Sequence, residues 1–419
     1  MTLRISAARN EKGVALPLAL FALVLLSGLL LAFLGMSLHE PQIAQNHVSS
    51  SRALHIADAG IEHAWAVLPS TPGITALSTG QTLNPFSAQV FGGGSYTVTV
   101  IKNADETHTI TSTALYKDAS RVIRAVVSLG PTLPSPRGAA ETLVDPTVPK
   151  PPGQSSKTEF DADPYGSFDG RDWNAPADIS ACADIAGCGT LLPDSNPSTY
   201  GAFTNMNVTS SDHITQASGG GNLVGTGCLP PSCSGTSTAS VSTQGETDAA
   251  VQLTQFNRWD SLIDAAKSKA TQTVTVDSPG LTGTHTFGTA AAPQITVINW
   301  NTSATNKWNA QVSGAGVLII EVQPTSNVVL RGTGGLDWQG LVIVRGVEVE
   351  YEIGCDGCAG PGGTNRVFGQ VVNRSSKYAE IEFENNRSFV KYSSAAMNMV
   401  RQQFQSFSSF KSWQEVAAP

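Results

Sequence analysis

The stretch 14–38, VALPLALFALVLLSGLLLAFLGMSL, contains no charged residue. As a helix it rises about 37 Å at roughly 1.5 Å per residue, more than the hydrocarbon core of about 30 Å. Three basic residues precede it, whereas the first charge after it is Glu40. Because basic residues that flank a membrane helix are found mostly on its cytoplasmic side, the N-terminus is predicted to be cytoplasmic. The sequence therefore predicts a single-pass membrane helix with the remaining chain outside.

The flanks of this stretch do not fit a cleavable secretory signal. Such a signal has a shorter apolar region, of roughly 7–15 residues, followed by small residues at the cleavage site, whereas here HEP follows at 39–41. Pro17 removes a backbone amide, which costs little in a first helical turn because that amide has no partner there. The position of Pro17 favours a mature chain that begins at Val14, directly after Gly13.

Composition limits the classes of partner and cofactor. The 419 residues allow two or three domains. Only 14% are charged and the net charge is -8, so no basic surface is expected for nucleic acid. In an exported chain, six cysteines in three close pairs favour local disulfides over zinc, with the connectivity left open. The pairs are Cys182 with Cys188, Cys228 with Cys233, and Cys355 with Cys358.

The membrane helix is predicted to continue outward, giving one helix over 14–70. Apolar residues recur there at helical spacing: Leu54, Ala57, Ile61, Ala64 and Leu68. Four histidines follow the same helix at intervals of eight residues: His39, His47, His55 and His63. Eight residues turn the side chain by roughly 80°, so the four circle the helix and predict no metal site.

A change to period two predicts an antiparallel β-meander over 80–130. Three β-rich runs, GSYTVTVI, THTITSTAL and SRVIRAVVSL, are joined by polar turns. The fold class is therefore α+β, with a long N-terminal helix packed on a small sheet. Seven prolines within 131–155 then predict a semi-rigid linker.

The region 156–245 is rich in turn-forming residues and is predicted to be irregular. Its oxygen donors are of the kind that calcium takes: Asp161, Asp163, Asp169, Asp172 and Asn174. Their spacing does not match an EF-hand and such residues also form turns, so no cofactor is assigned and calcium is left open. A helix over 246–273 is then predicted from an apolar stripe: Val251, Phe256, Trp259, Leu262, Ile263 and Ala266.

The segment 274–395 carries an approximate repeat. GVLIIEV at Gly316, GLVIVRG at Gly340 and GQVVNRS at Gly369 are 24 and then 29 residues apart. Such spacing predicts a β-solenoid, in which stacked strands share a core, and a β-sandwich is the alternative. Residues 396–419 are predicted to be a C-terminal tail.

Alternating glutamates mark two strands of this segment. Period two puts each trio on one strand face: Glu348, Glu350 and Glu352, and Glu380, Glu382 and Glu384. A solvated outer face is favoured over a calcium or partner site, with Arg345, Arg366, Lys377 and Arg387 available as counterions.

No catalytic site is predicted. The chain lacks G-x-S-x-G, P-loop and H-E-x-x-H motifs, and His108, His213 and His285 have no recognisable nucleophile partner. We therefore expect no enzymatic activity. A polysaccharide-acting enzyme is kept as an alternative, because parallel β-helices include such enzymes.

Two segments carry a resemblance to a known family. The leader NEKG, the apolar stretch and then RALHIADAGIEHAW resemble the N-terminal segment of PilX-type minor type IV pilins. The matching residues are Lys12, Gly13, Ala53, Ala57, Asp58, Ala59, Gly60 and Ile61. The glycine-rich C-terminal pattern is similar to the large β-rich extensions of some of these proteins.

The resemblance implies processing and a location. The leader 1–13 would be cut by prepilin peptidase after Gly13, and Val14 would be N-methylated. The chain would wait in the inner membrane with its bulk in the periplasm, then enter a surface filament. Its helix, including Pro17, Leu18, Phe21 and Leu25, would pack in the filament core. Implied partners are other minor and major pilins, the inner-membrane assembly platform and a tip adhesin.

One departure from the family pattern suggests a position in the filament. Most major pilins carry Glu as the fifth mature residue, where this chain has Leu18. A buried carboxylate needs a partner, and the subunit at the tip has no subunit above it to supply one. The resemblance therefore predicts a low-abundance tip or priming subunit, with an outward β domain for adhesion or partner contact.

Two alternatives remain open. A K-like pseudopilin of type II secretion also lacks the glutamate, but its usual large domain is helical. A membrane-anchored surface adhesin or enzyme outside any filament would keep its leader uncleaved.

Overall fold

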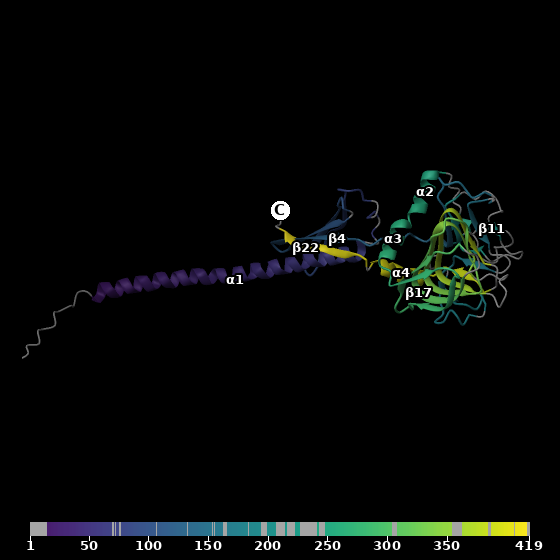
Figure 1. Cartoon of the computed structure of the whole chain (residues 1–419). Helices are drawn as coiled ribbons and strands as arrows, with labels where there is room; N and C mark the ends of the chain where they lie inside the picture. The colour runs from purple at the N-terminus through teal and green to yellow at the C-terminus, as the bar shows by residue number, and fades with distance from the viewer. Residues whose placement is uncertain are drawn as a thin grey trace, which may run out of the picture. The chain divides into compact units, whose positions relative to one another are not determined.

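One continuous helix, α1 (Ala15–Val67), precedes all the strands (Figure 1). The computed structural model describes residues 15–68, 71, 73–74, 77–105, 107–131, 133–152, 154, 156–161, 166–182, 184–193, 199–206, 214–215, 223–226, 241–242, 248–303, 308–353, 363–383, 387–405 and 407–416. The chain forms two units, Met1–Ser128 with Ser409–Pro419, and Leu129–Ser408. The second unit is thus an insertion in the sequence of the first.

An antiparallel sheet of five strands follows α1 in the first unit. Its order is β1-β2-β3-β4-β22, with β1 (Thr82–Phe91), β2 (Gly94–Lys102), β3 (His108–Tyr116), β4 (Ala119–Ser128) and β22 (Ser409–Val416). The meander expected from Gly94 onward is present as β2, β3 and β4. β1 was not expected as a strand, because Pro85 and two register shifts interrupt its pattern.

Small residues bring α1 close to this sheet. Ala53, Ala57 and Ala64 are fully buried. A Cβ atom on Gly60 would lie 2.3 Å from Ser112 Oγ and 3.0 Å from Tyr96 Cδ2, so a larger residue would crowd these side chains. The predicted amphipathic part of the helix therefore packs on the sheet.

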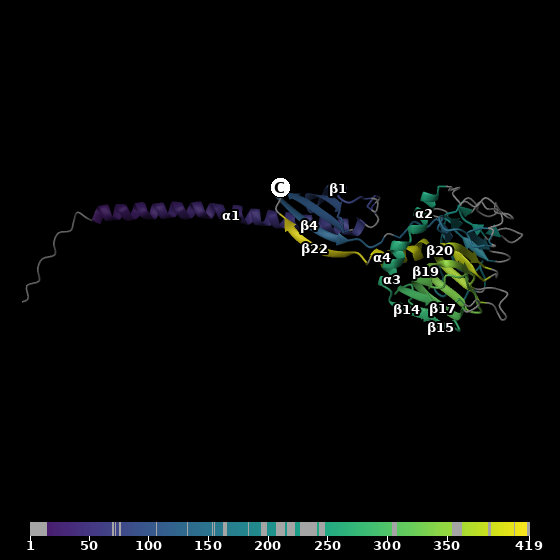
Figure 2. The same ribbon diagram turned by 45° about the horizontal axis from the view of Figure 1, so that its top comes forward.

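Parallel strands in register form the second unit (Figure 2). The main run joins β14 (Gln272–Val276), β16 (Gln294–Trp300), β17 (Trp308–Val322), β19 (Gly335–Tyr351), β20 (Asn365–Glu382), β21 (Phe389–Lys391), β7 (Ser167–Asp169) and β12 (Leu223–Val224). Their apolar runs meet in one buried core. Together with α1 and the antiparallel sheet, this β-rich region confirms the α+β class.

Shorter strands extend the same sheet. Parallel pairs join β5 (Gly138–Leu143) to β10 (Tyr200–Thr204) and to β20, β6 (Thr158–Asp161) to β11 (Ile214–Thr215) and to β20, β13 (Val241–Ser242) to β10, β15 (Leu281–Phe287) to β17, and β18 (Val328–Leu330) to β19. A separate antiparallel pair joins β8 (Trp173–Asn174) and β9 (Thr190–Leu191).

The repeated glycines of the sequence form one row across the strands. Gly316 pairs with Gly340, and Gly340 with Gly369. All three have positive φ, at 115°, 134° and 141°. A Cβ on Gly340 would lie 2.1 Å from the Gly316 carbonyl oxygen, and one on Gly369 would lie 1.9 Å from the Gly340 carbonyl oxygen. The glycine spacing therefore reflects both backbone conformation and close strand approach.

The predicted proline-rich linker over 131–155 is wrong, because it contains a buried strand. Within β5, Ala139, Ala140 and Leu143 are fully buried, and the strand pairs with β10 on one side and with β20 on the other. The prolines flank this strand instead of interrupting it, so no ladder amide is lost.

Three helices complete the second unit: α2 (Ala249–Asn257), α3 (Asp260–Ser268) and α4 (Ser394–Gln405). The single helix predicted over 246–273 is divided in two at residues 258–259, and Val251 is exposed instead of joining the buried stripe. The predicted C-terminal tail is also wrong, since α4 and the sheet strand β22 occupy it.

Ion pairs hold α2 and α3 against the strands. Three arginine–carboxylate pairs span 2.5, 2.8 and 2.9 Å. They join Arg258 to Glu141, Arg374 to Asp260, and Arg345 to Asp264.

Candidate functional site

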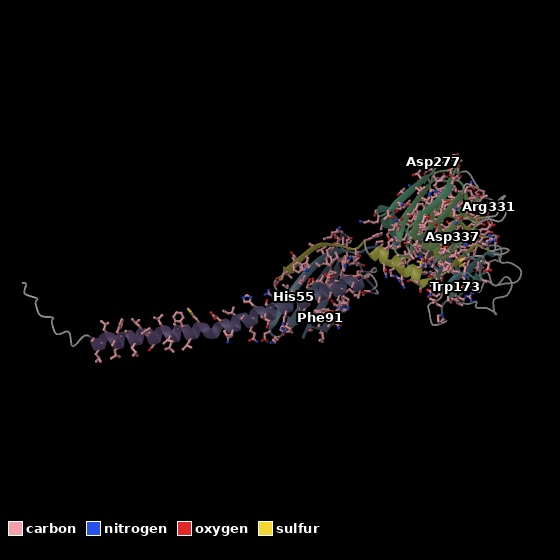
Figure 3. The ribbon with its side chains drawn as sticks, turned by 90° about the horizontal axis from the view of Figure 1, so that it is seen from below. His55, Phe91, Trp173, Asp277, Arg331 and Asp337 are labelled. Carbon is pink, nitrogen blue, oxygen red and sulfur yellow. A yellow bond between two sulfur atoms is a disulfide. The ribbon has the colours of Figure 1, made fainter. Side chains whose placement is uncertain are left out.

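The apolar half of α1 contacts no other part of the described chain. Its most apolar window has a mean hydropathy of 2.7 and is 0% buried. Leu18, Phe21 and Leu25 are 66%, 66% and 52% exposed, and Figure 3 shows the side chains of this half pointing away from the helix on all sides. Length and composition allow this helix to cross a membrane.

The other residues of the predicted pilin signature divide between α1 and the leader. Ala53, Ala57 and Gly60 lie on the face of α1 that meets the sheet, and Asp58 and Ala59 are half-buried beside them. Pro17 lies in the first turn of α1. Gly13 and Val14, the predicted cleavage and methylation residues, lie outside the described residues.

A cluster of carboxylates lies on strands β19 and β20. Oxygens of Glu350, Glu352 and Glu380 all lie within 4.8 Å of one another, the one such group found in the described part of the chain. Glu350 and Glu380 are register partners on adjacent strands. Their neighbours are Asn327, whose Nδ2 donates to Glu350 Oε1 at 2.6 Å, and Arg331, which pairs with Glu352.

Tyr378 links this cluster to a third strand. Its hydroxyl lies 2.8 Å from Glu380 Oε2 and 3.0 Å from Glu159 Oε2 on β6. One hydroxyl proton can serve only one of these two acceptors at a time. Two carboxylates therefore compete for one donor.

Burial and like charge raise the pKa of Glu380. Desolvation is the main cause, the Tyr378 hydrogen bond opposes it, and the charges of Glu159 and Glu350 add to it, so that the pKa reaches about 8. Burial and the neighbouring glutamates also raise the pKa of Tyr378. At neutral pH, Glu380 is therefore largely protonated.

The solvated outer face predicted for the glutamates is wrong for two of them. Glu352 and Glu380 are only 4% and 9% exposed, because strands stacked about 4.8 Å away on either side shield a side chain between them. Glu348 keeps a contact with Lys377 at 3.1 Å. Glu384 lies outside the described residues.

The counterion of the cluster was missed in the sequence. Arg345 pairs with Glu321 and Asp264, and Arg366 pairs with Asp337, so neither serves the glutamates as predicted. Arg331 does so instead, with Glu382 also 3.8 Å away. Parallel pairing of Leu330 with Tyr351 brings Arg331 beside Glu352, a relation that only the strand register reveals.

Those aspartates considered for calcium that the structure describes do not gather into a group of possible metal ligands. Asp169 is buried and paired with Arg171 at 2.7 Å. Asp172 Oδ1 accepts from the Ser394 backbone amide at 2.8 Å. Asp161 lies on β6, and Asp163 is outside the described residues. The three glutamates are the oxygen donors that a hard cation could use, although Arg331 already neutralises one of them.

One predicted disulfide is present, between Cys182 and Cys188. Two cations hold the backbone of its loop: Arg366 Nη1 donates to the Cys182 carbonyl at 2.8 Å, and Lys391 Nζ donates to the Cys188 carbonyl at 2.6 Å. Burial lowers the pKa of Lys391 to about 8. The remaining cysteines, Cys228, Cys233, Cys355 and Cys358, lie outside the described residues.

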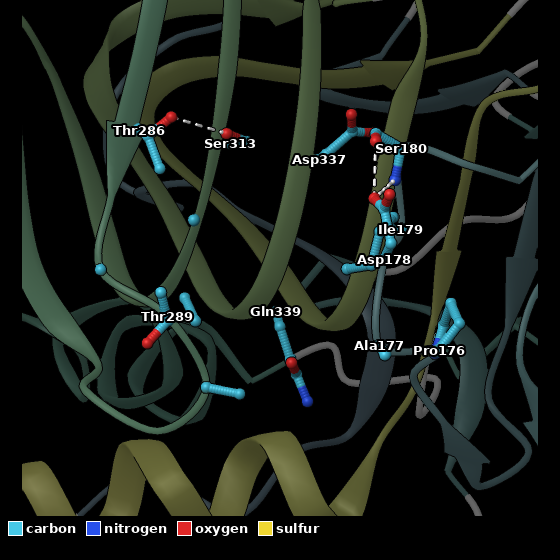
Figure 4. Close-up of a pocket in the computed structure, with 14 residues that line it drawn as sticks. Pro176, Ala177, Asp178, Ile179, Ser180, Thr286, Thr289, Ser313, Asp337 and Gln339 are labelled. Carbon is cyan, nitrogen blue, oxygen red and sulfur yellow. Dashed lines mark hydrogen bonds between the residues drawn. The ribbon is translucent and has the colours of Figure 1, made fainter.

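Beside this loop is a groove of about 250 Å³, which we call the hydroxyl groove (Figure 4). Residues 176–180 form one side. The opposite side comes from the end of β15 and the turn after it, and the floor comes from β17 and β19. No sequence pattern predicted this groove, because its two sides lie about a hundred residues apart in the chain.

Comparisons with known proteins give little support to any family. No protein-family model matches the chain, and no curated protein matches it. Among solved structures, the competence-associated pilin ComZ from Thermus thermophilus is similar at 10% sequence identity. The alignment covers 88% of this chain and 97% of that one, with a TM-score of 0.24. At that score no inference about this chain follows from the likeness.

Proposed function

We propose that this chain is a pilin-like structural subunit of a type IV filament, held in the inner membrane by α1 before assembly. The observation that carries the proposal is the contrast within one helix. In its apolar first half the most apolar window has no buried residue, whereas its second half packs on an antiparallel sheet through Ala53, Ala57 and Gly60. Exposed apolar surface of this size needs a membrane or other helices to cover it.

The leader suggests how the chain would be processed before assembly. Prepilin peptidase would cut between Gly13 and Val14 and Val14 would then be N-methylated, in line with the PilX-type resemblance. The helix then serves twice, first as a membrane anchor and later as part of a filament core with other minor and major pilins. The assembly platform is the remaining inner-membrane partner.

We further propose a position at or near the filament tip. Leu18 supports it, because an apolar residue there needs no ammonium from a subunit above. If a defect in filament assembly were cured only by Leu18→Glu in this chain, the chain would need the terminal ammonium of a subunit above it. The tip position would then be wrong.

For the second unit we infer a β-solenoid. Its support is the parallel, in-register pairing of strands at successive spacings of 22, 24 and 29 residues through Gln294, Gly316, Gly340 and Gly369. A β-sandwich would pair its strands antiparallel. In the filament this unit would serve adhesion or contact with a tip adhesin, not catalysis.

Sheared filaments test the proposal directly. Quantitative mass spectrometry of filaments sheared from cells should detect the chain at a small fraction of the major subunit. A Gly13→Arg variant, which would block cleavage, should stay in the membrane fraction, whereas Ser6→Arg, which adds the same charge to the leader away from the junction, should behave as wild type. If the wild-type chain were recovered only from the membrane fraction, the result would support the alternative, a surface adhesin outside any filament.

A further inference from the structure

The floor of the hydroxyl groove is made of small residues. Gly314 and Ala315 line it, and Gly288 lies on the turn at its side. Small side chains leave the outer surface of β15, β17 and β19 open at this point. The groove is therefore a consequence of strand packing.

Polar groups surround this floor. The hydroxyls of Thr286 and Ser313, register partners on adjacent strands, lie 3.2 Å apart. The amide of Gln339 has no hydrogen-bond partner among the described residues, and Figure 4 shows it projecting into the open space. These groups offer both donors and acceptors to a ligand.

A carboxylate from the segment just before the disulfide loop completes the set. Asp178 Oδ1 accepts from the Ser180 hydroxyl at 2.6 Å and from the Ser180 amide at 2.9 Å. These hydrogen bonds lower the pKa of Asp178, so it stays ionised. The Ala181 backbone also contributes a hydrogen bond to this carboxylate, whose remaining lone pairs can accept from a ligand hydroxyl.

The charges of the groove argue against an anionic ligand. No Lys or Arg is among the residues that line it. Its deepest charge, Asp337, is balanced by Arg366, whose Nε donates to Asp337 Oδ1 at 2.7 Å, and by Gln311, whose Nε2 donates to Oδ2 at 3.0 Å. A phosphate or nucleic acid would meet negative charge without a free cation. Its apolar lining residues are Pro176, Ala177, Ile179, Ala290 and Ala315, and no aromatic ring is among them.

A neutral ligand with several adjacent hydroxyls fits these groups, and we propose that the hydroxyl groove binds one sugar unit of a neutral glycan. A volume of 250 Å³ equals that of about eight waters at roughly 30 Å³ each. This is room for a single ring and is smaller than most drug-sized sites. With few hydrogen bonds and no stacking ring, the dissociation constant should be on the order of 1 mM.

The wall that carries Asp178 is held in place without a ligand. Arg366 Nη1 donates to the carbonyls of Ser180 and Cys182 at 3.2 and 2.8 Å, and the Cys182–Cys188 disulfide closes the loop. A wall that is already ordered loses less entropy on binding. All residues of the site belong to the second unit, so this proposal does not depend on whether the chain enters a filament.

Saturation-transfer NMR on the full chain tests this proposal, in a zwitterionic detergent that has no sugar headgroup. The probes are glucose, galactose, mannose and N-acetylglucosamine at millimolar concentration, with inorganic phosphate as an anionic probe. We expect transfer to at least one of the four sugars. Gln339→Ala should lower the affinity for that sugar about fivefold to tenfold, the loss expected for one hydrogen bond.

The matched control is Gln323→Ala, the same change at an exposed glutamine outside the groove. It should bind as wild type does. If Gln339→Ala lowers the melting temperature, Asp178→Asn on the exposed loop replaces it, with the same expected loss. The proposal is overturned if none of the four sugars receives saturation, if the groove variant and Gln323→Ala bind equally, or if phosphate alone binds.

Discussion

The two units of this chain are built mostly from contacts of different range, and the exception in the first unit is β22, which pairs with β4 across the whole inserted second unit. In the first, strands β2, β3 and β4 follow one another along the chain and pair with their sequence neighbours. In the second, β20 pairs with β5 and β6, more than two hundred residues earlier. Glycine matters in both, because Gly60 lets a helix approach a sheet, whereas Gly340 lets strand meet strand.

The difference lies in what each glycine must satisfy. Gly60 has an ordinary helical backbone, and its nearest neighbour, Ser112 Oγ, is a side-chain atom that can rotate away. Gly340 has a φ of 134° and faces the backbone oxygen of Gly316, which cannot move alone. The second unit should therefore tolerate less change than the first.

The largest effect is expected from Gly340→Ala. A side chain at this φ costs about 1–3 kcal/mol, and the backbone clash adds to it, so the second unit should lose more than about 3 kcal/mol of unfolding free energy. Gly283→Ala is the matched control, since its φ is also positive, at 86°, but nothing lies within 4 Å of the added Cβ. Denaturant unfolding followed by the fluorescence of Trp300, Trp308 and Trp338 measures both. Equal losses in the two variants would show that close strand approach is unimportant.

The next effect concerns Glu380 and pH. Its pKa is about 8 in the folded chain and near 4.5 when unfolded, so the folded state holds a proton that the unfolded state releases. The contribution of Glu380 to the free energy of unfolding is complete below about pH 4.5. It is lost as the pH rises to about 8, at up to about 1.4 kcal/mol per pH unit. Glu380→Gln should flatten this decline in unfolding experiments from pH 5 to 8.

The control for that series is Glu348→Gln, which changes a carboxylate paired with Lys377 on the same face. It should keep the slope of the wild type. An unchanged slope in Glu380→Gln would mean that Glu380 is ionised in the folded state at neutral pH.

The smallest effect is a coupling in the first unit. Gly60→Ala should cost about 1 kcal/mol, because the new methyl group crowds Ser112 Oγ and outweighs the gain in helix propensity. Ser112→Ala removes that oxygen, so the double variant should recover part of the loss in a double-mutant cycle. Additive losses would place the crowding elsewhere, for example at Tyr96.

The local part of the fold could be predicted from the sequence, and the non-local part could not. The apolar run and the small residues at Ala53 and Ala57 predicted α1, and alternation predicted β2 to β4. The strand β5 was hidden between prolines. Its burial depends on β20 and β10, which no local pattern reveals.

The same limit applied to the candidate sites. Period two placed Glu350 and Glu352 on one strand face, but the pairing of Glu352 with its counterion Arg331 depends on the register of β18 against β19. The groove required Asp178 and Gln339 to meet across 161 residues of sequence. Neither a motif nor a spacing marks such a meeting.

The N-terminus of the mature chain tests the central claim most directly. The chain should be purified from membranes of the native cell and its N-terminal peptide measured by mass spectrometry. A pilin-like subunit predicts a peptide that begins at Val14 and carries one added methyl group. An intact leader that still contains Lys12 and Gly13 would contradict the account, because an uncut chain cannot be the filament subunit proposed for α1.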